Sequence, residues 1–122
     1  MEADFKRGDV VWVNLNPTIG SETGKVRPCV IVQNDVGNTY SPVTIVAVIT
    51  SQKRLSQKYP VDVWVGKGEG GLDVPSIVLC DQIRTIDKRR IAKRLGRFSG
   101  PTMKEIDKAL KISLAPGLAE RT

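Results

Sequence analysis

The fold of this chain is decided by the stretch Gly24-Lys25-Val26-Arg27-Pro28-Cys29-Val30-Ile31-Val32-Gln33-Asn34. A glycine suited to a turn leads into an arginine and a proline, and four residues suited to a buried strand follow before the next turn. We expect a strand over residues 28–33, with Pro28 at its first position or at a sheet edge, because proline cannot donate to a ladder. Arg27 would then lie where a loop meets the sheet, a common place for binding and catalytic groups. Composition alone favours the simpler interpretation, a strand whose first exposed residue happens to be basic.

Four further segments on either side of this stretch have the composition of strands. Residues 10–15 are β-branched and aromatic. Residues 43–50 are the most apolar run, so we expect a central strand covered on both faces. Residues 61–65 alternate, which predicts a strand with one solvated face. Residues 76–80 predict another buried strand, and residues 81–86 follow it directly.

Turns and one helix complete the predicted order of elements. Residues 34–38 form a turn cluster, and residues 66–71 hold four of the eleven glycines, which predicts a flexible connection. A short last strand is expected near residues 95–98. Ser99-Gly100-Pro101 then opens a helix, and Pro116-Gly117 ends it. The apolar stripe of this helix is Met103, Ile106, Leu110 and Leu114.

The length and the order of elements predict one mainly β domain over residues 1–122, a small antiparallel barrel or sandwich with a C-terminal α-helix. No stretch approaches the roughly 18 apolar residues of a membrane span, and residues 1–6 lack an apolar signal region. Cys29 and Cys80 both lie in apolar runs, so we interpret them as core thiols in preference to a disulfide. These features predict a cytoplasmic protein with no membrane partner.

The absence of histidine limits the possible chemistry more than any other feature of the composition. It removes the usual acid–base group at neutral pH and excludes serine–histidine and cysteine–histidine nucleophile pairs. Two cysteines without histidine leave no tetrahedral zinc site. We therefore expect no metal and no cofactor, and an enzyme of this composition would rely on Arg, Lys, Asp, Glu, Ser, Thr, Tyr or Cys.

The net charge of +6 comes from a single segment, residues 84–97. The segment has one acid, Asp87, and the rest of the chain has twelve basic and twelve acidic residues. Its seven basic residues are Arg84, Lys88, Arg89, Arg90, Lys93, Arg94 and Arg97. Such a patch favours a polyanion, either nucleic acid or an acidic protein tail. A solvated basic face without a ligand is the simpler alternative.

Short motifs spread along the chain point to a known family. They are Arg7-Gly8-Asp9-Val10, Gly20-Ser21-Glu22, Val26-Arg27-Pro28, Gln33-Asn34-Asp35, Val48-Ile49-Thr50-Ser51, Asp81-Gln82-Ile83-Arg84-Thr85-Ile86-Asp87 and Ile112-Ser113-Leu114. Each is weak alone, but their order and gaps resemble those of the MazF/PemK family of toxin endoribonucleases. The resemblance extends from Lys6 to Leu114, nearly the whole chain.

The resemblance implies the toxin of a type II toxin–antitoxin system with an SH3-like barrel and a two-fold homodimer. It implies metal-independent, sequence-specific cleavage of single-stranded RNA. The 2′-hydroxyl attacks the adjacent phosphate, which leaves a 2′,3′-cyclic phosphate and a 5′-hydroxyl. A cognate antitoxin protein would block the RNA groove with an extended, partly acidic segment.

The resemblance also assigns the catalytic positions to Arg27 and Thr50. The planar fork of Arg27 matches phosphate oxygens, and Thr50 offers a hydroxyl donor on a stiff β-branched side chain. The family also gives this arginine a part in proton transfer, although an arginine pKa above about 12 disfavours a neutral base. Without the resemblance, a capping hydroxyl at a strand end is the simpler interpretation of Thr50.

Other positions are RNA-binding candidates by the same resemblance, and no metal site is implied. They are Ser21, Glu22, Ser51, Tyr59, Pro60 and Gln82. The ring of Tyr59 could stack on a base, although packing at the start of a strand is an equally good explanation. Residues 51–58 and 88–97 depart most from the family pattern, which leaves the target RNA sequence open.

Two other functions compete with the endoribonuclease. A gyrase-inhibiting toxin of the CcdB type uses the same barrel, but that class lacks the Arg27 and Thr50 pair in this context. A non-catalytic barrel that binds nucleic acid or a protein partner would also fit the net charge. Of the three, only the endoribonuclease predicts RNA fragments when the protein is incubated with RNA in EDTA.

Overall fold

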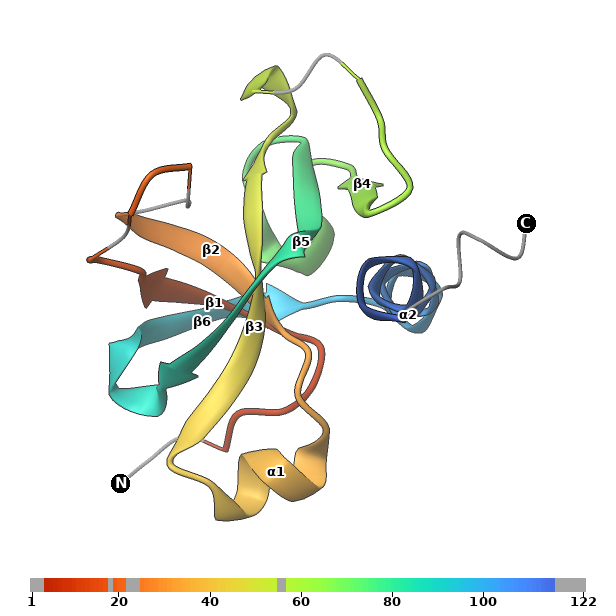
Figure 1. Cartoon of the computed structure of the whole chain (residues 1–122). Coiled ribbons are helices and arrows are strands. Elements are labelled where there is room, and N and C mark those ends of the chain that lie inside the picture. Colours follow the sequence, from red (N-terminus) through yellow and green to blue (C-terminus); the bar gives the residue numbers. More distant parts are fainter. Residues whose placement is uncertain (1–3, 18, 22–24, 55–56, 116–122) are drawn as a thin grey trace.

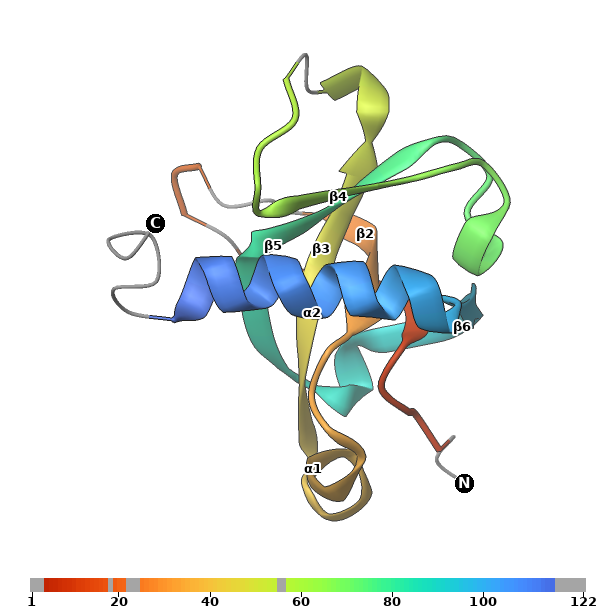
Figure 2. The ribbon, with the colours of Figure 1, turned by 90° about the vertical axis from the view of Figure 1, so that its right-hand side faces the viewer.

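The structure of this chain is a computed structural model that describes residues 4–17, 19–21, 25–54 and 57–115. A six-stranded antiparallel sheet in the order β4-β5-β3-β2-β1-β6 carries the helix α2 (Gly100–Leu114) across one face (Figures 1 and 2). The strands are β1 (Asp9–Asn14), β2 (Val26–Ile31), β3 (Val43–Ser51), β4 (Asp62–Val65), β5 (Ser76–Asp87) and β6 (Ile91–Arg97). The predicted mainly β class with a C-terminal helix is confirmed.

The central strand β3 has a hydrophobic core on each of its faces. It lies between β2 and β5, and its alternate residues point to opposite faces. Ala47 and Ile49 belong to the helix-side core with Ile106 of α2, whereas Val46 and Val48 belong to the opposite core. The prediction that residues 43–50 are covered on both faces is therefore confirmed.

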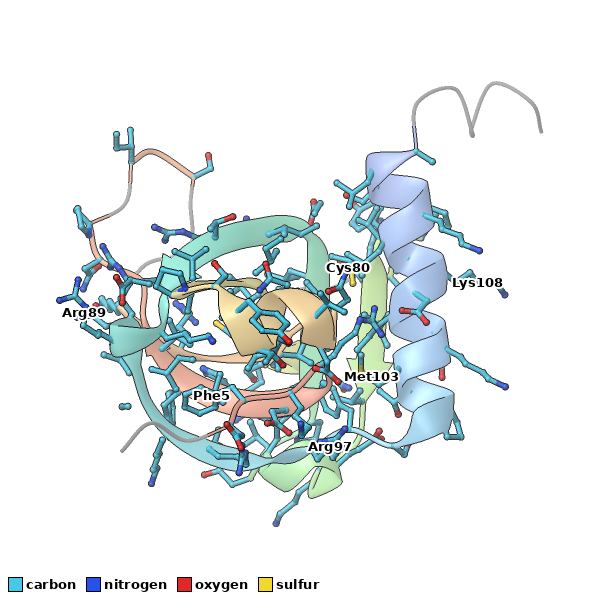
Figure 3. The ribbon with its side chains drawn as sticks, turned by 90° about the horizontal axis from the view of Figure 1, so that it is seen from below. Phe5, Cys80, Arg89, Arg97, Met103 and Lys108 are labelled. Atoms are coloured by element: carbon cyan, nitrogen blue, oxygen red, sulfur yellow. The ribbon has the colours of Figure 1, made fainter. Side chains whose placement is uncertain are left out.

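Helix α2 packs through the predicted stripe, except at its last position. Ser99 is the N-cap, and its Oγ accepts a hydrogen bond from Thr102 N at 3.3 Å. Ile106 is fully buried, whereas Leu114 at the end of the helix is 63% exposed. Figure 3 shows Met103 on the side of α2 that faces the sheet and Lys108 on the opposite side. The predicted stop at Pro116-Gly117 lies outside the described residues.

The glycine-rich segment 66–71, predicted as a flexible connection, is a packed turn. It contains a short 3-10 helix, η2 (Glu69–Gly71), that lies against β6. A Cβ at Gly71 would lie only 2.1 Å from the carbonyl oxygen of Leu95, and its φ of +79° also favours glycine. Because η2 connects edge strand β4 to β5, this contact brings one edge of the sheet to the other, so the open sheet resembles a barrel.

Several other boundaries differ from the sequence predictions. The turn predicted at residues 34–38 is a helix, α1 (Asp35–Tyr40), because the side chain of Asn34 accepts from Gly37 N at 2.9 Å and caps it. Strand β6 begins at Ile91, earlier than residue 95. The predicted solvated face of β4 is also wrong at Asp62, which is 8% exposed. None of the helices in the described part of the chain is long and apolar enough to span a membrane.

Candidate active site

Strands β2 and β3 separate at one end of the sheet, and this separation creates the candidate site. Their ladder pairs Ile31 with Val46, Val30 with Ala47, and Cys29 with Val48, where it ends. The next residue of β2 is Pro28, which has no N–H to continue the ladder. Figure 1 shows the two strands diverging beyond this point.

Arg27 and Thr50 are held on the two sides of this opening. The register of the ladder would place them opposite each other if pairing continued, since Cys29 pairs with Val48 and each residue lies two positions beyond. Each strand is fixed instead by its other neighbour, with Arg27 paired to Val13 of β1 and Thr50 to Ile77 of β5. The two side chains are therefore anchored on rigid strands.

A pocket of about 490 Å³ occupies the opening. Arg27, Thr50 and Ser51 line it, and Trp12 and Lys93 extend it across β1 and β6. Lys93 pairs with Trp12, and Trp12 pairs with Pro28, so these three residues form a row across three strands. The other wall consists of Gly71, the last residue of η2, and of residues 72–74 in the loop that follows.

The polar groups of the pocket suit an anionic ligand. Thr50 is 6% exposed and lines the pocket, and within the described residues its hydroxyl makes no hydrogen bond. Arg27 is half-buried at the pocket wall. A fork of guanidinium donors beside a hydroxyl donor is an arrangement that binds and polarises a phosphate.

The nearest thiol is not a nucleophile. Burial raises the pKa of Cys29 to about 12, against the opposing effect of the charges on Arg84 and Arg27. Burial likewise raises the pKa of Cys80 to about 12, and both cysteines are free. The prediction that they are core thiols is confirmed, and both remain protonated at neutral pH.

Comparison with known proteins identifies the family. Residues 6–114 match the family described as "PemK-like, MazF-like toxin of type II toxin-antitoxin system". The chain belongs to this toxin family.

Individual relatives agree with this assignment. A Bacillus subtilis (strain 168) protein named Endoribonuclease EndoA is 44% identical over 110 residues, which cover 90% of this chain and 94% of that protein. The crystal structure of MazF from Deinococcus radiodurans is similar with a TM-score of 0.78 at 26% identity, covering 93% and 98% of the two chains. A mycobacterial endoribonuclease in complex with its cognate antitoxin has the same fold, with a TM-score of 0.74 at 24% identity over 91% and 95% of the chains.

In the structure of this MazF-like toxin, the predicted RNA-binding residues do not all lie in the pocket of Arg27 and Thr50. Ser51 lies in the pocket beside Thr50, and Ser21 is exposed on the loop between β1 and β2. Tyr59 and Pro60 line a different groove, against α2. Gln82 is half-buried where the pairing of β5 with β3 shifts register. Glu22 lies outside the described residues.

Among the residues that line the toxin's pocket, the aromatic and charged side chains of Trp12, Asp73 and Lys93 are not among the site residues predicted from the sequence. Trp12 was interpreted only as part of a strand, and Lys93 only as one charge of the basic segment. The positions of Trp12 and Lys93 depend on the pairing of β1 with both β2 and β6, which links parts of the chain about 80 positions apart. Asp73 reaches the pocket on the loop between η2 and β5. A strand assigned to residues 91–97 would have been the signal for Lys93, because it places this lysine on the edge next to β1.

Most cations of the basic segment bind acceptors within the toxin itself. Arg94 and Arg97 form ion pairs of 3.0 and 3.1 Å with Asp9, whose side chain is 3% exposed. Arg84 donates to the carbonyl oxygen of Leu15 at 2.7 Å. Lys88 and Arg90 also donate to backbone carbonyls, and Arg89 pairs with Asp87 at the outer edge of the molecule (Figure 3). The cations of the segment therefore mainly stabilise the fold, and Lys93 is the one that lines the pocket.

Proposed function

We propose that this MazF-like toxin is a metal-independent, sequence-specific endoribonuclease that cleaves single-stranded RNA, including mRNA. The observation that carries the proposal is the placement of Arg27 and Thr50 on the two strands that part around one pocket. The Bacillus subtilis relative named as an endoribonuclease supports the same reaction class.

The reaction uses a nucleophile that the substrate supplies. The 2′-hydroxyl oxygen gives up its proton and bonds to the adjacent phosphorus, the bond from phosphorus to the 5′ oxygen breaks, and the 5′ oxygen takes up a proton. The products are a 2′,3′-cyclic phosphate and a 5′-hydroxyl. Negative charge grows on the phosphoryl oxygens in the transition state. Arg27 stabilises that charge with its parallel donors and Thr50 with its hydroxyl, and one such donor contributes about 3 kcal/mol. The chain has no histidine, so the usual acid–base group for the two proton transfers is absent, and the family resemblance assigns a part in them to Arg27.

Residues around the pair would hold the RNA strand. Ser51 is adjacent to Thr50 and lines the same pocket. We propose that the remaining candidates contact nucleotides further from the cut, where the loops set which bases are accepted. These candidates are Ser21, Glu22, Tyr59, Pro60 and Gln82.

The test is incubation of the purified toxin with a long RNA in the presence of EDTA. We expect discrete fragments with 5′-hydroxyl and 2′,3′-cyclic phosphate ends, mapped by end-specific labelling and ligation. An RNA that remains intact would reject this function and favour the gyrase-binding or non-catalytic alternative. Fragmentation that requires added Mg²⁺ would reject the mechanism.

The toxin's proposed protein partners are a second copy of itself and an antitoxin. The mycobacterial endoribonuclease of the same fold forms a complex with a cognate antitoxin. We expect an acidic, flexible segment of the antitoxin of this chain to order over Arg27, because an acidic chain can replace the RNA backbone in a cationic groove. Hydrogen exchange of the Arg27 region that is the same with and without antitoxin would contradict this.

Homodimerisation is proposed on the family assignment and on the exposed apolar side chains that a small sheet leaves. Ile19, Val26 and Leu114 are 84%, 54% and 63% exposed. Two-fold pairing is the commonest way to cover such surface. Light scattering should give twice the chain mass at micromolar concentration, and a monomer mass would contradict the dimer. We expect the toxin to act in the cytoplasm, where mRNA is available and free thiols persist.

A further inference from the structure

We propose that a second nucleotide subsite, built by Trp64, Lys53 and Lys67, lies beside the catalytic pair and binds the nucleotide next to the cut. This inference rests on the proposed endoribonuclease function. It concerns a separate pocket of about 480 Å³, within the roughly 300–1,000 Å³ typical of small-molecule sites.

The two pockets are contiguous. They share three lining residues, Ser51, Asp73 and Val74. Ser51 follows Thr50 directly, so an RNA strand whose phosphate lies at Thr50 can continue into the second pocket along the protein surface. A single-stranded RNA is the occupant that this continuity fits, because consecutive nucleotides need consecutive pockets.

Hydrogen bonds hold one lining residue of the second pocket, Gln52, to the neighbouring strands. Gln52 Nε2 donates to the carbonyl oxygens of Val65 at 3.1 Å and Ser76 at 3.3 Å. Gln52 N donates to the carbonyl oxygen of Pro75 at 3.1 Å. These bonds join the end of β3 to β4 and β5, so the subsite is preformed and a ligand need not order it.

Trp64 presents a stacking surface to this pocket. It lies on β4, pairs with Ile77 of β5 and is partly exposed, while its Nε1 is fully buried and has no hydrogen-bond partner within the described residues. The exposed part of the indole is therefore carbon. Exposed carbon of an indole allows a base to stack on it whatever the identity of the base, as in proteins that bind single strands.

The charges of the subsite match a phosphate backbone. Lys53 and Lys67 line it, and within the described residues neither ammonium forms an ion pair. Asp73 is the single acid among the described residues that line the two pockets, against four cations. The four cations are Arg27, Lys53, Lys67 and Lys93. An aromatic side chain that can stack on a base and lysines that can bind a phosphate, in a pocket next to the reacting phosphate, together suit a nucleotide.

The experiment measures binding of an RNA that cannot be cut. Once the cleavage site is mapped, the oligonucleotide carries a 2′-deoxy residue there and one abasic residue, moved from position to position on both sides of the cut. Dissociation constants are measured in EDTA by fluorescence anisotropy. The proteins are wild type, Trp64→Leu, Trp64→Phe and the matched control Tyr40→Leu, which changes an exposed ring on α1.

We expect the wild-type protein to lose about 5- to 150-fold in affinity when the base at one position adjacent to the cut is removed, the range for one stacked base. Trp64→Leu should bind the intact RNA more weakly than the wild type by the same factor. Removal of the base at that one position should not weaken the binding of Trp64→Leu further, whereas removal of bases elsewhere should affect it as in the wild type. Trp64→Phe should keep most of the wild-type sensitivity, and Tyr40→Leu should keep all of it. Thermal melting tests whether each variant is folded. If Trp64→Leu does not fold, the comparison rests on Trp64→Phe, which keeps an aromatic ring.

The lysines provide a second measurement. Lys53→Gln and Lys67→Gln should each reduce the slope of log affinity against log salt by about 0.7, the value for one phosphate contact on a single strand. A folded Trp64→Leu protein with the wild-type abasic profile, or lysine variants with the wild-type salt slope, would overturn the subsite. Wild-type toxin that fails to cleave RNA would overturn the proposed function and the subsite with it, so the two failures are distinguishable.

Discussion

The basic segment 84–97 and the two pockets both concentrate cations, but they use them differently. The segment carries the whole net charge, yet most of its arginines donate to acceptors of the fold, above all to the buried Asp9. The pocket cations are dispersed in the sequence, at positions 27, 53, 67 and 93, and converge only through strand pairing. A charge cluster in a sequence therefore does not locate a ligand site, because edge strands also need cations to bind their own acceptors.

The largest difference between the two regions should appear when a pocket cation is removed. Arg27→Ala should lower the rate of RNA cleavage by roughly 10³–10⁵-fold, the range for an arginine that stabilises a phosphoryl transition state. Arg27→Lys should restore little, because a point charge cannot replace two parallel donors. Single-turnover cleavage of a labelled oligonucleotide measures both. A folded Arg27→Ala protein with the wild-type rate would refute the assignment.

The next effect isolates the neutral donor of the pocket. Thr50→Val keeps the shape of the side chain and removes only the hydroxyl, so the cleavage rate should fall by roughly 10²–10³-fold. RNA affinity should change far less, since the hydroxyl acts mainly in the transition state. Comparing the dissociation constant of a 2′-deoxy substrate with the single-turnover rate separates the two effects. A large loss of affinity with little loss of rate would assign Thr50 to binding alone.

Removal of the carboxylate that binds the basic segment should lower the stability of the protein and leave the cleavage rate unchanged. Asp9→Ala leaves Arg94 and Arg97 without their shared carboxylate and should lower the free energy of unfolding by about 2 kcal/mol. Asp9→Asn should lose less, because its amide oxygen still accepts hydrogen bonds. Urea unfolding measures the loss, and cleavage per folded molecule should remain at the wild-type level. Unchanged stability would mean that these ion pairs do not hold β1 to β6.

The smallest effect is expected when a single lysine of the basic segment, Lys93, is replaced, and a second cation of the segment provides the control. Lys93→Gln should reduce the salt slope of RNA affinity by about 0.7, because Lys93 lines the pocket. Arg89→Gln is the matched control, since Arg89 pairs with Asp87 at an exposed position outside the pocket. Its salt slope and melting temperature should equal those of the wild type. Equal slopes for the two variants would contradict the distinction between segment and pocket.

Local patterns were sufficient for much of the fold. The β-branched run at 43–50 and the stripe that includes Ile106 predicted the central strand and the helix, because burial of alternate or every third to fourth residue depends on neighbours in sequence. The helix α1 was missed because its cap, Asn34, is also a typical turn residue. The packed turn at Gly71 was missed because its contact, Leu95, lies 24 positions later.

The sequence by itself determined the strand order along the chain, the C-terminal helix, the toxin family and the positions of Arg27 and Thr50. Only the tertiary structure decided that Pro28 ends the β2–β3 ladder so that these two residues line one pocket. It also decided that Lys93 and Trp64 face the two connected pockets, while Arg94 and Arg97 turn to Asp9. The physical reason is that propensity and periodicity act over a few residues, whereas a pocket is defined by pairing between strands far apart in the chain.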